Sequence, residues 1–407
     1  MSARSLKPGW KMVTFGDVVE NVVARANPAD VRTDIYVGLE HLEPGTLHLR
    51  RWGHPSDVTG EKLFFKKGDV IFGRRRAYQR KLAVADCDGI CSAHAMVVRA
   101  KPDMILPEFL PFFLQSDMFM ERAIEISVGS LSPTINWKTM RIQEFPLPPL
   151  DEQKRIAEIL WAADEAVECY LSLKNALHLK KSTITRKIMP SNVPFSSLRK
   201  GIIPGIKASK LKDVCEKITD GTHQSPSFSN YGVPFLLISN IDNGDVNWNV
   251  SKWVTEETYA QLTKTTKPEV GDVLFTVVAS YGDAVFIDWS KPFAFQRHIA
   301  IIKPKHTILD GRFLYYFLRS TLGKKQSEIY AEGLAQKTIT LKSLGQFCVP
   351  TPPISVQKAI CDELDAIEQL IFKCQNTLFD CQALLRQLKN TLIGGRQCLT
   401  KKTPSSS

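Results

Sequence analysis

One stretch of this sequence occurs twice, and this repetition constrains the fold more than any other feature. Residues 146–160 and 350–364 are identical at seven of fifteen positions, which include three prolines and a Gln-Lys pair. The second copy starts 204 residues after the first (350 minus 146) in a chain of 407 residues. A tandem duplication of this size predicts two similar domains that form a pseudo-dimer within one chain.

The repeat extends well upstream of the proline-rich stretches. Gly-Asp-Val-Ile-Phe at 68–72 recurs as Gly-Asp-Val-Leu-Phe at 271–275, and a Thr-Ile pair recurs at 134–135 and 338–339. The matched positions are mostly apolar residues or glycine. The sequence therefore predicts two similar scaffolds that carry different polar surfaces.

The segments that follow the two proline-rich stretches have the hydrophobic period of a helix. In the second copy, apolar residues alternate in steps of four and three, which is typical of a coiled coil. This seam comprises Ile360, Leu364, Ile367, Ile371, Cys374, Leu378, Cys381, Leu385, Leu388 and Leu392. The first copy has Ile156, Leu160, Ala163, Val167, Tyr170, Lys174, Leu177, Lys181, Ile184 and Ile188 at the same positions. We expect two long helices, with Asp151 and Ser355 as their N-caps.

The two helices are too long to be covered by domains of this size, so each is expected to pair with the other. Antiparallel pairing would relate the two halves by a pseudo-two-fold axis. It would also hold the two domains at a fixed separation, as a ruler does. The predicted segments are globular domains at 1–145 and 206–349, helical spacers at 146–190 and 350–395, a flexible linker at 191–205 and a disordered tail at 396–407.

The charge of the chain points to a polyanionic partner. The net charge is +11. Residues 1–145 contribute +3 (20 minus 17) and residues 196–349 contribute +5 (19 minus 14). A basic excess in the globular regions is typical of nucleic-acid binding. No apolar run approaches the roughly 20 residues that span a bilayer. The nine cysteines have no regular spacing, which indicates a reducing, cytoplasmic location.

The densest candidate for DNA contacts follows the first Gly-Asp motif. It comprises Arg74, Arg75, Arg76, Tyr78, Gln79, Arg80 and Lys81. Arginine forks match guanine edges and phosphates, and glutamine can pair with adenine. The competing interpretation is a solvated charge run without function. The second copy has no arginine at 276–282, so two such loops would read different bases. Further candidates are His94, Ser280, Tyr281, Gln296, Arg297 and His298.

Catalytic signatures are missing from the sequence. Cys87, Cys91 and His94 have a zinc-like spacing, but the second copy has Lys291 and Phe295 at the two cysteine positions, and a fourth ligand is not nearby. The chain contains no phosphate-binding loop, dinucleotide fingerprint or nucleophile elbow. It also lacks the Asn-Pro-Pro-Tyr and Asp-Pro-Pro-Tyr tetrapeptides of amino-methyltransferases. We therefore expect no catalytic residues and no metal site.

With these motifs the chain resembles the specificity subunits of type I restriction–modification systems. The resemblance is carried by residues 145–156, by both Gly-Asp motifs, and by the segments 129–135 and 333–339 that precede the helices. It covers nearly the whole chain. It implies a mixed α/β (α+β) fold with two tandem target recognition domains, separated by two long antiparallel coiled-coil helices.

The resemblance also implies partners and cofactors. Such a subunit binds double-stranded DNA, two methyltransferase (modification) subunits and two restriction or motor subunits. Each domain would read one half of a bipartite, asymmetric site, while S-adenosylmethionine, ATP and magnesium would belong to the partners. Two alternatives stay open at this point. One is a specificity subunit whose partner fuses methyltransferase and nuclease, and the other is a non-catalytic coiled-coil adaptor.

Overall fold

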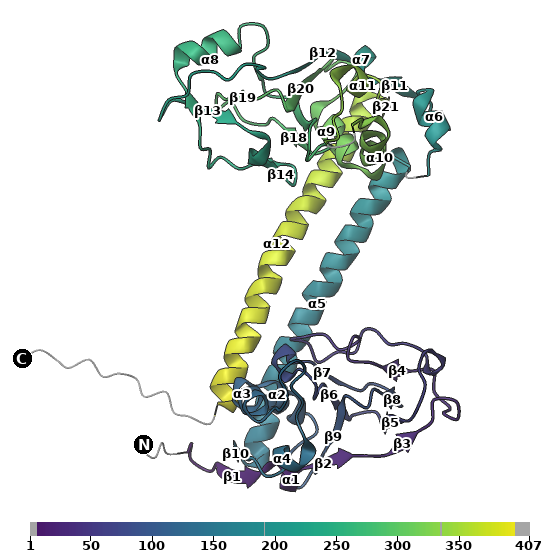
Figure 1. Cartoon of the computed structure of the whole chain (residues 1–407), viewed down its shortest axis with the longest axis vertical. Coiled ribbons are helices and arrows are strands. Elements are labelled where there is room, and N and C mark those ends of the chain that lie inside the picture. Colours follow the sequence, from purple (N-terminus) through teal and green to yellow (C-terminus); the bar gives the residue numbers. More distant parts are fainter. Residues whose placement is uncertain (1–5, 191, 334–335, 395–407) are drawn as a thin grey trace, which may run out of the picture. The chain divides into compact units, whose positions relative to one another are not determined.

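The computed structural model describes residues 6–190, 192–333 and 336–394, and its contacts divide the chain into two units (Figure 1). Unit 1 comprises Met1–Leu171 and Asn376–Ser407, and unit 2 comprises Ser172–Gln375. The division passes through both long helices, so each unit combines one globular domain with half of each helix. The tail expected at 396–407 lies outside the described residues.

Unit 1 is a mixed α/β domain. A four-stranded sheet has the order β2 (Val19–Val22), β9 (Met96–Ala100), β6 (Val70–Phe72), β7 (Leu82–Val84). A second sheet has the order β3 (Arg25–Ala26), β5 (Lys62–Phe65), β8 (Gly89–Cys91), β4 (Tyr36–Val37). The helices of the domain are α1 (Phe15–Val18), α2 (Leu110–Gln115), α3 (Asp117–Glu125) and α4 (Trp137–Met140). Strands β1 (Lys11–Thr14) and β10 (Glu144–Leu147) pair antiparallel, which brings the two ends of the domain together.

Unit 2 repeats this plan. Its four-stranded sheet has the order β12 (Cys215–Asp220), β20 (Ile299–Pro304), β17 (Val273–Thr276), β18 (Ala284–Phe286). The smaller sheets are β16 (Trp253–Val254), β13 (Val233–Leu236), β19 (Ala294–Phe295), and the pair β14 (Ile241–Asp242), β15 (Asp245–Val246). Its helices are α7 (Leu211–Val214), α8 (Glu256–Leu262), α9 (Gly311–Arg319), α10 (Thr321–Tyr330) and α11 (Leu341–Leu344). Strands β11 (Ala208–Lys210) and β21 (Cys348–Pro350) close the domain as β1 and β10 do.

The repeated Gly-Asp motif fixes the turn into the central strand of each sheet. Gly68 and Gly271 have φ values of +90° and +100°, which favour glycine. The buried Asp69 carboxylate accepts a hydrogen bond from the Lys66 amide and pairs with Arg99 at 2.7 Å. In unit 2 the buried Asp272 accepts from the Glu269 amide and pairs with Lys303 on β20. A backbone requirement and a buried ion pair therefore explain why this motif recurs.

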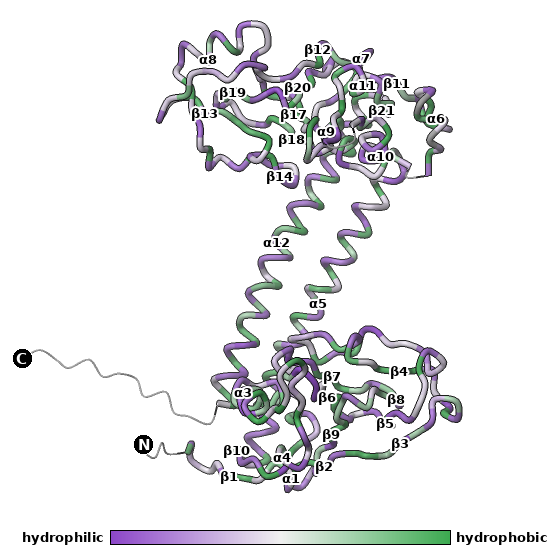
Figure 2. Tube along the Cα trace, viewed as in Figure 1, coloured by the Kyte–Doolittle hydropathy of each residue, from purple (hydrophilic) through white to green (hydrophobic). Residues whose placement is uncertain are grey.

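The helices α5 (Leu150–Ile188) and α12 (Ile354–Ile393) confirm the two long helices expected from the sequence. In unit 1 the first turns of α5 share a core with the last turns of α12. In unit 2 the last turns of α5 meet the first turns of α12, so the helices run antiparallel in each unit. The residues that pack in unit 1 are Ile156, Leu160, Val167, Leu378, Leu385 and Ile393, and those in unit 2 include Ile184, Ile360, Cys361 and Leu364. Figure 2 shows the alternation of hydrophobic and hydrophilic residues along both helices.

The predicted seam agrees well with the burial in α12. Leu364, Ile367, Ile371, Cys374, Leu378 and Leu385 are buried, while Ile360, Cys381, Leu388 and Leu392 are partly buried. In α5, Leu177 is only partly buried. Its lysine neighbour Lys181 forms an ion pair with Glu368 of α12 instead of an apolar contact.

The predicted N-caps are wrong. Both helices begin two residues earlier than these caps predict, at Leu150 and Ile354, and the carbonyl of Pro149 accepts the first helical hydrogen bond from Gln153. In α12 the carbonyl of Pro353 has the same role. Asp151 therefore lies in the first turn, where its charge favours the positive end of the helix dipole.

In the segment predicted as a linker, residues 192–205 are more structured than their proline and glycine content indicates. They include the helix α6 (Phe195–Arg199), and Val193, Leu198 and Ile203 are buried in the core of unit 2. The expected flexible linker is corrected to this extent. Apolar residues spaced along the segment pack on the domain that follows it, which overrides the local preference for loop.

A second repeated residue joins each long helix to its domain. Gln153 is fully buried, accepts a hydrogen bond from the Leu106 amide and donates to the carbonyls of Met104 and Pro148. Gln357 makes the equivalent three bonds in unit 2, to the Asp310 amide and to the carbonyls of Ile308 and Pro352. The Gln of the proline-rich repeat is therefore a structural residue, because it satisfies three backbone groups at the base of each helix.

Candidate nucleic-acid interface

Three loops meet beside the central sheet of unit 1. The β6–β7 connection carries the arginine cluster, and it touches both the β8–β9 loop and the turn at 128–135. Arg74 donates from Nη2 to the carbonyl of Ala93 at 2.9 Å. The Arg76 amide donates to the carbonyl of Pro133 at 2.7 Å, and the Ile135 amide donates to the carbonyl of Arg74 at 3.0 Å. We call this arrangement the three-loop frame.

The outward-facing part of the cluster carries charge that no carboxylate neutralises. Arg75 and Arg76 are exposed, and each guanidinium lies within 3.3 Å of the Ser132 hydroxyl. Among the described residues, neither arginine forms an ion pair. Tyr78 is 53 % exposed beside them. Two guanidinium groups and a phenol ring are suited to contact phosphates and base edges.

The backbone of this loop is strained at two positions. Arg76 and Arg80 have φ values of +57° and +51° and flank a short 3-10 turn, Ala77–Gln79. Residues with a Cβ rarely adopt this conformation, which costs of order 1 kcal/mol or more for each residue. The counterpart of Arg76 in unit 2, Ala279, has a φ of +58°. Both frames therefore hold a non-glycine residue in the same conformation.

Other members of the cluster are used inside unit 1. Arg80 pairs with Asp117 at the start of α3, and this hydrogen bond lowers the pKa of the Asp117 carboxyl. Lys81 donates from Nζ to the carbonyl of Leu39 at 2.9 Å. Gln79 is partly buried, and His94 is exposed on the adjacent β8–β9 loop. The contiguous run in the sequence therefore divides into outward-facing residues and residues held by the domain.

Unit 2 builds the same frame with different side chains. The Val277 amide donates to the carbonyl of His298 at 3.0 Å, the Ile339 amide to the carbonyl of Val277 at 2.8 Å, and the Ala279 amide to the carbonyl of Lys337 at 3.2 Å. Of the candidates there, Ser280 and Arg297 are exposed, while Tyr281, Gln296 and His298 are partly buried. The exposed Lys337 was not among the sequence candidates, because a lone lysine carries no motif.

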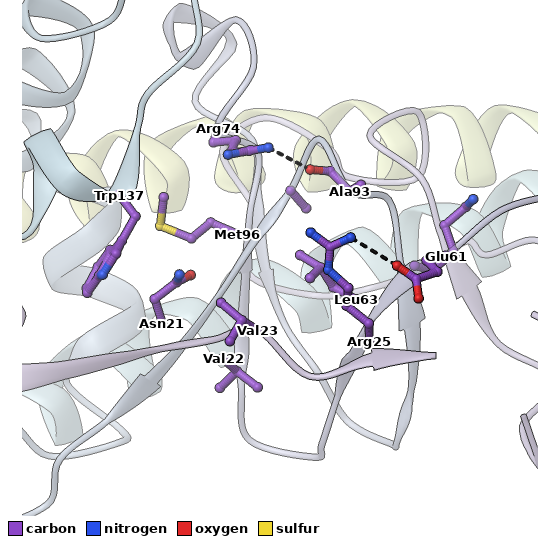
Figure 3. A pocket seen from close by; sticks show the side chains of 12 residues that line it. Asn21, Val22, Val23, Arg25, Glu61, Leu63, Arg74, Ala93, Met96 and Trp137 are labelled. Atoms are coloured by element: carbon purple, nitrogen blue, oxygen red, sulfur yellow. Dashed lines mark hydrogen bonds and ion pairs between the residues drawn. The ribbon is translucent and has the colours of Figure 1, made fainter. Parts of the chain in front are cut away.

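A cavity of about 180 Å³ lies beside the arginine loop of unit 1 (Figure 3). It brings Arg74, Arg25 and Trp137 to one recess, and Arg25 pairs with Glu61 at 3.0 Å. In unit 2, strand β12 is longer than its counterpart β2 in unit 1. Just beyond β12, at the place that corresponds to the cavity, the Thr222 amide donates to the carbonyl of Phe295. Trp137 and Arg25 were missed by sequence reasoning, since they lie about 60 and 50 residues from Arg74 and belong to other elements.

The described residues contain no group of three or more His, Cys, Asp or Glu side chains able to hold a metal ion. Cys91 is fully buried, and burial raises the pKa of its thiol to about 12. In the same part of the chain, no helix is both long and apolar enough to cross a membrane.

Both units match one protein family over most of their length. The family is described as the type I restriction modification DNA specificity domain, and it matches residues 8–178 and 205–379. The chain belongs to this family. The match occurs twice, in agreement with the duplication, and each match combines a three-loop frame with the start of a long helix.

Relatives of this specificity-domain protein cover nearly the whole chain or about half of it. It is 25 % identical to a putative type I restriction enzyme MjaX specificity subunit of Methanocaldococcus jannaschii, over 95 % of this chain and 93 % of that protein. It is 27 % identical to the EcoDI specificity subunit of Escherichia coli over 46 % of this chain and 41 % of that one. An S subunit structure from M. genitalium has the same fold, with a TM-score of 0.57 at 15 % identity, covering 94 % of this chain and 96 % of that chain.

Proposed function

We propose that this chain is the DNA-recognition subunit of a type I restriction–modification enzyme, and that each unit reads one half of a bipartite, asymmetric site. The supporting observation is the three-loop frame, which recurs in both units with two equivalent backbone hydrogen bonds but different exposed side chains. In unit 1 the frame presents Arg75, Arg76 and Tyr78. In unit 2 it presents Ser280, Arg297 and Lys337. Different side chains on one frame provide two different base specificities.

The long helices provide surfaces for methyltransferase subunits. Large apolar side chains are exposed on them, namely Leu173, Leu179, Leu370, Phe372, Phe379 and Leu384, with exposed fractions between 45 % and 71 %. In unit 2 an apolar groove of about 550 Å³ between the helices is lined by Leu179, Ile184 and Ile360. Exposed apolar area of this kind marks a protein interface. The relatives are specificity subunits, which favours two methyltransferase subunits as the occupants, with two restriction or motor subunits added to that core.

The chemistry of the enzyme then resides in the partners. S-adenosylmethionine, ATP and magnesium are bound by the methyltransferase and motor subunits, and this chain contributes no catalytic residue. The proposal is supported by the resemblance of both halves to specificity domains and by the missing methyltransferase motifs. It also fits a partner in which methyltransferase and nuclease are fused, and co-purification with one or with several partner chains separates the two cases.

The test is methyl transfer to DNA by the purified chain, alone and after addition of its methyltransferase partner. We expect transfer only with the partner, and only at one bipartite sequence in a randomised DNA library. Methylation by the chain alone would contradict the proposal. Methylation by the complex without sequence preference would favour the coiled-coil adaptor instead.

A further inference from the structure

A cavity in unit 2 is lined by four lysines and arginines and one carboxylate, and we propose that it binds a phosphate group. It has a volume of about 410 Å³ and lies between the last turns of α5 and the corner of α9 and α10. Its titratable lining includes His178, Lys181, Arg186, Arg319, Lys324 and Glu368. We call it the cationic cavity. It lies apart from the three-loop frame, whose residues do not line it.

The charges in this cavity do not cancel. Four lysines and arginines face a single carboxylate, that of Glu368, and this carboxylate already accepts hydrogen bonds from Lys181 and from the Tyr316 hydroxyl. Arg186 and Lys324 are exposed to the solvent and form no ion pair among the described residues. A polyanion is therefore the ligand that the electrostatics favour.

Arg319 is held in place mainly by uncharged groups. Its Nη2 donates to the carbonyl of Asn243 at 2.7 Å, and Nη1 donates to the Tyr315 hydroxyl. Its one ion pair among the described residues is long, with 4.0 Å between Nε and the Asp283 carboxylate. Side chains with hydroxyl groups, Ser182 and Thr321, also line the cavity. Fixed guanidinium, flexible ammonium and hydroxyl donors together match the several oxygens of a phosphate better than the two of a carboxylate.

The equivalent place in unit 1 is built to exclude an anion. At the offset of 204, Arg319, Thr321 and Lys324 correspond to Gln115, Asp117 and Met120, and Arg186 corresponds to Asn390. There, Asp117 accepts hydrogen bonds from Arg80 and from Asn390, and Lys389 donates to Gln115. The duplicated corner is thus closed by a polar network in unit 1 and opened and made cationic in unit 2. This difference indicates a ligand, because the scaffold alone does not require the charges.

Two sources can supply the phosphate. One is the backbone of DNA bound by the chain, and this case rests on the proposed function. The other is a free polyphosphate such as that of a nucleotide, which does not depend on DNA binding. The full-length chain serves for both measurements. The test variant is the double substitution Arg186→Gln with Lys324→Gln, and the matched control is Lys342→Gln with Lys358→Gln, at exposed lysines of unit 2 outside the cavity.

In the first arm, binding of a short DNA duplex is measured at several salt concentrations. Loss of one phosphate contact should reduce the salt slope of log K by about 0.9 in the test variant, compared with the control. In the second arm, binding of sodium tripolyphosphate and of ATP is measured by calorimetry. If the source is free polyphosphate, we expect at least a tenfold weaker affinity in the test variant and an unchanged affinity in the control.

A third variant guards against a general effect of lost charge. Thr321→Asp introduces the carboxylate that unit 1 has at this position and should abolish phosphate binding while retaining both arginines. Equal behaviour of the test variant and the control in both arms would overturn the inference. The inference would also be overturned if the test variant kept its DNA salt slope and its polyphosphate affinity but no longer assembled with the methyltransferase. The cavity would then bind an acidic segment of that protein instead of a phosphate. Failure of the proposed function would give a different result, because the unaltered chain would then show no sequence selectivity for DNA.

Discussion

The two units use one scaffold but treat the corner between domain and helices in opposite ways. In unit 1 this corner is filled, because Lys389 of α12 is buried against Gln115, and Asn390 and Arg80 share the Asp117 carboxylate. In unit 2 the same corner is a cavity of about 410 Å³ rimmed by exposed cations. Residues that fix the backbone are retained in both units. Residues that set the local charge without fixing the backbone differ between the units, and these differences give the two halves separate roles.

The largest effect should come from the residues that the units share. Gln153→Ala leaves the partly buried Leu106 amide and two carbonyls without their partner and should destabilise unit 1 by roughly 3 kcal/mol. Gln357→Ala should cost unit 2 about the same. Hydrogen exchange, resolved for each unit, measures the two effects separately. Lys154→Ala and Lys358→Ala, at the exposed neighbouring positions, are the controls. A large loss of stability in one unit alone would mean that the two glutamine junctions do not contribute equally to the two units.

The next effect concerns the difference between the two three-loop frames. Replacing Arg74, Arg75 and Arg76 by Ala should weaken binding to the half-site read by unit 1 by roughly 1–3 kcal/mol for each lost base contact. Binding to the half-site read by unit 2 should not change. Affinities for DNA with either half-site altered measure this, with Arg32→Ala as the control at an exposed arginine of the same unit. An equal loss of affinity for all DNA sequences would mean that the three arginines contact only phosphates.

A smaller effect should arise from the buried lysine of unit 1. Burial lowers the pKa of the Lys389 ammonium from 10.5 to about 8. Because the folded chain binds this proton less tightly than the unfolded chain, unit 1 should gain stability as the pH rises from about 8 to 10.5. Lys389→Met should remove this dependence and change stability at neutral pH by about 1 kcal/mol, since the Gln115 Oε1 atom then loses its donor. Urea unfolding across this pH range measures it. Persistence of the slope in the variant would assign it to another group.

The smallest effect should come from the contact between a loop of unit 1 and α5. His48 lies 2.6 Å from the buried Asp164 carboxylate, and this hydrogen bond raises the pKa of the imidazole above 6.5. The contribution to stability is present below pH 6.5 and is lost as the pH rises through the higher folded value. The His48 side chain is 38 % exposed, so solvent screening limits the effect to under about 1 kcal/mol. Unfolding of His48→Gln at acidic and alkaline pH tests it, and an equal loss at both would contradict the titration.

Much of the fold could be predicted from the sequence, because its signals are local or periodic. The apolar steps of α12 predict its buried seam from Leu364 to Leu385, and glycines with left-handed φ explain the repeated Gly-Asp turns. Predictions failed where the tertiary structure overrides local preference. The proline-containing segment 192–205 contains a helix and buried residues, and the N-caps fall on Pro149 and Pro353 because their carbonyls accept the first helical bonds.

The candidate site could be predicted only in part. The sequence placed a cationic cluster after β6, but it could not show that Arg80 and Lys81 have partners inside unit 1 while Arg75 and Arg76 do not pair with a carboxylate. Whether the exposed members contact DNA stays a prediction. The cationic cavity had no sequence signal at all, because its residues come from α5, α9, α10 and α12.

The sequence by itself determined the duplication, the two long helices, their heptad seam and the family of the protein. Each of these depends on spacing along the chain, which a sequence displays directly. Only the tertiary structure decided which charged residues are neutralised and which face the solvent. Asp117 joins Arg80 to Asn390, residues 37 and 273 positions away from it, and Lys389 meets Gln115 across 274 positions. A side chain's free charge depends on such distant partners, and folding alone brings them together.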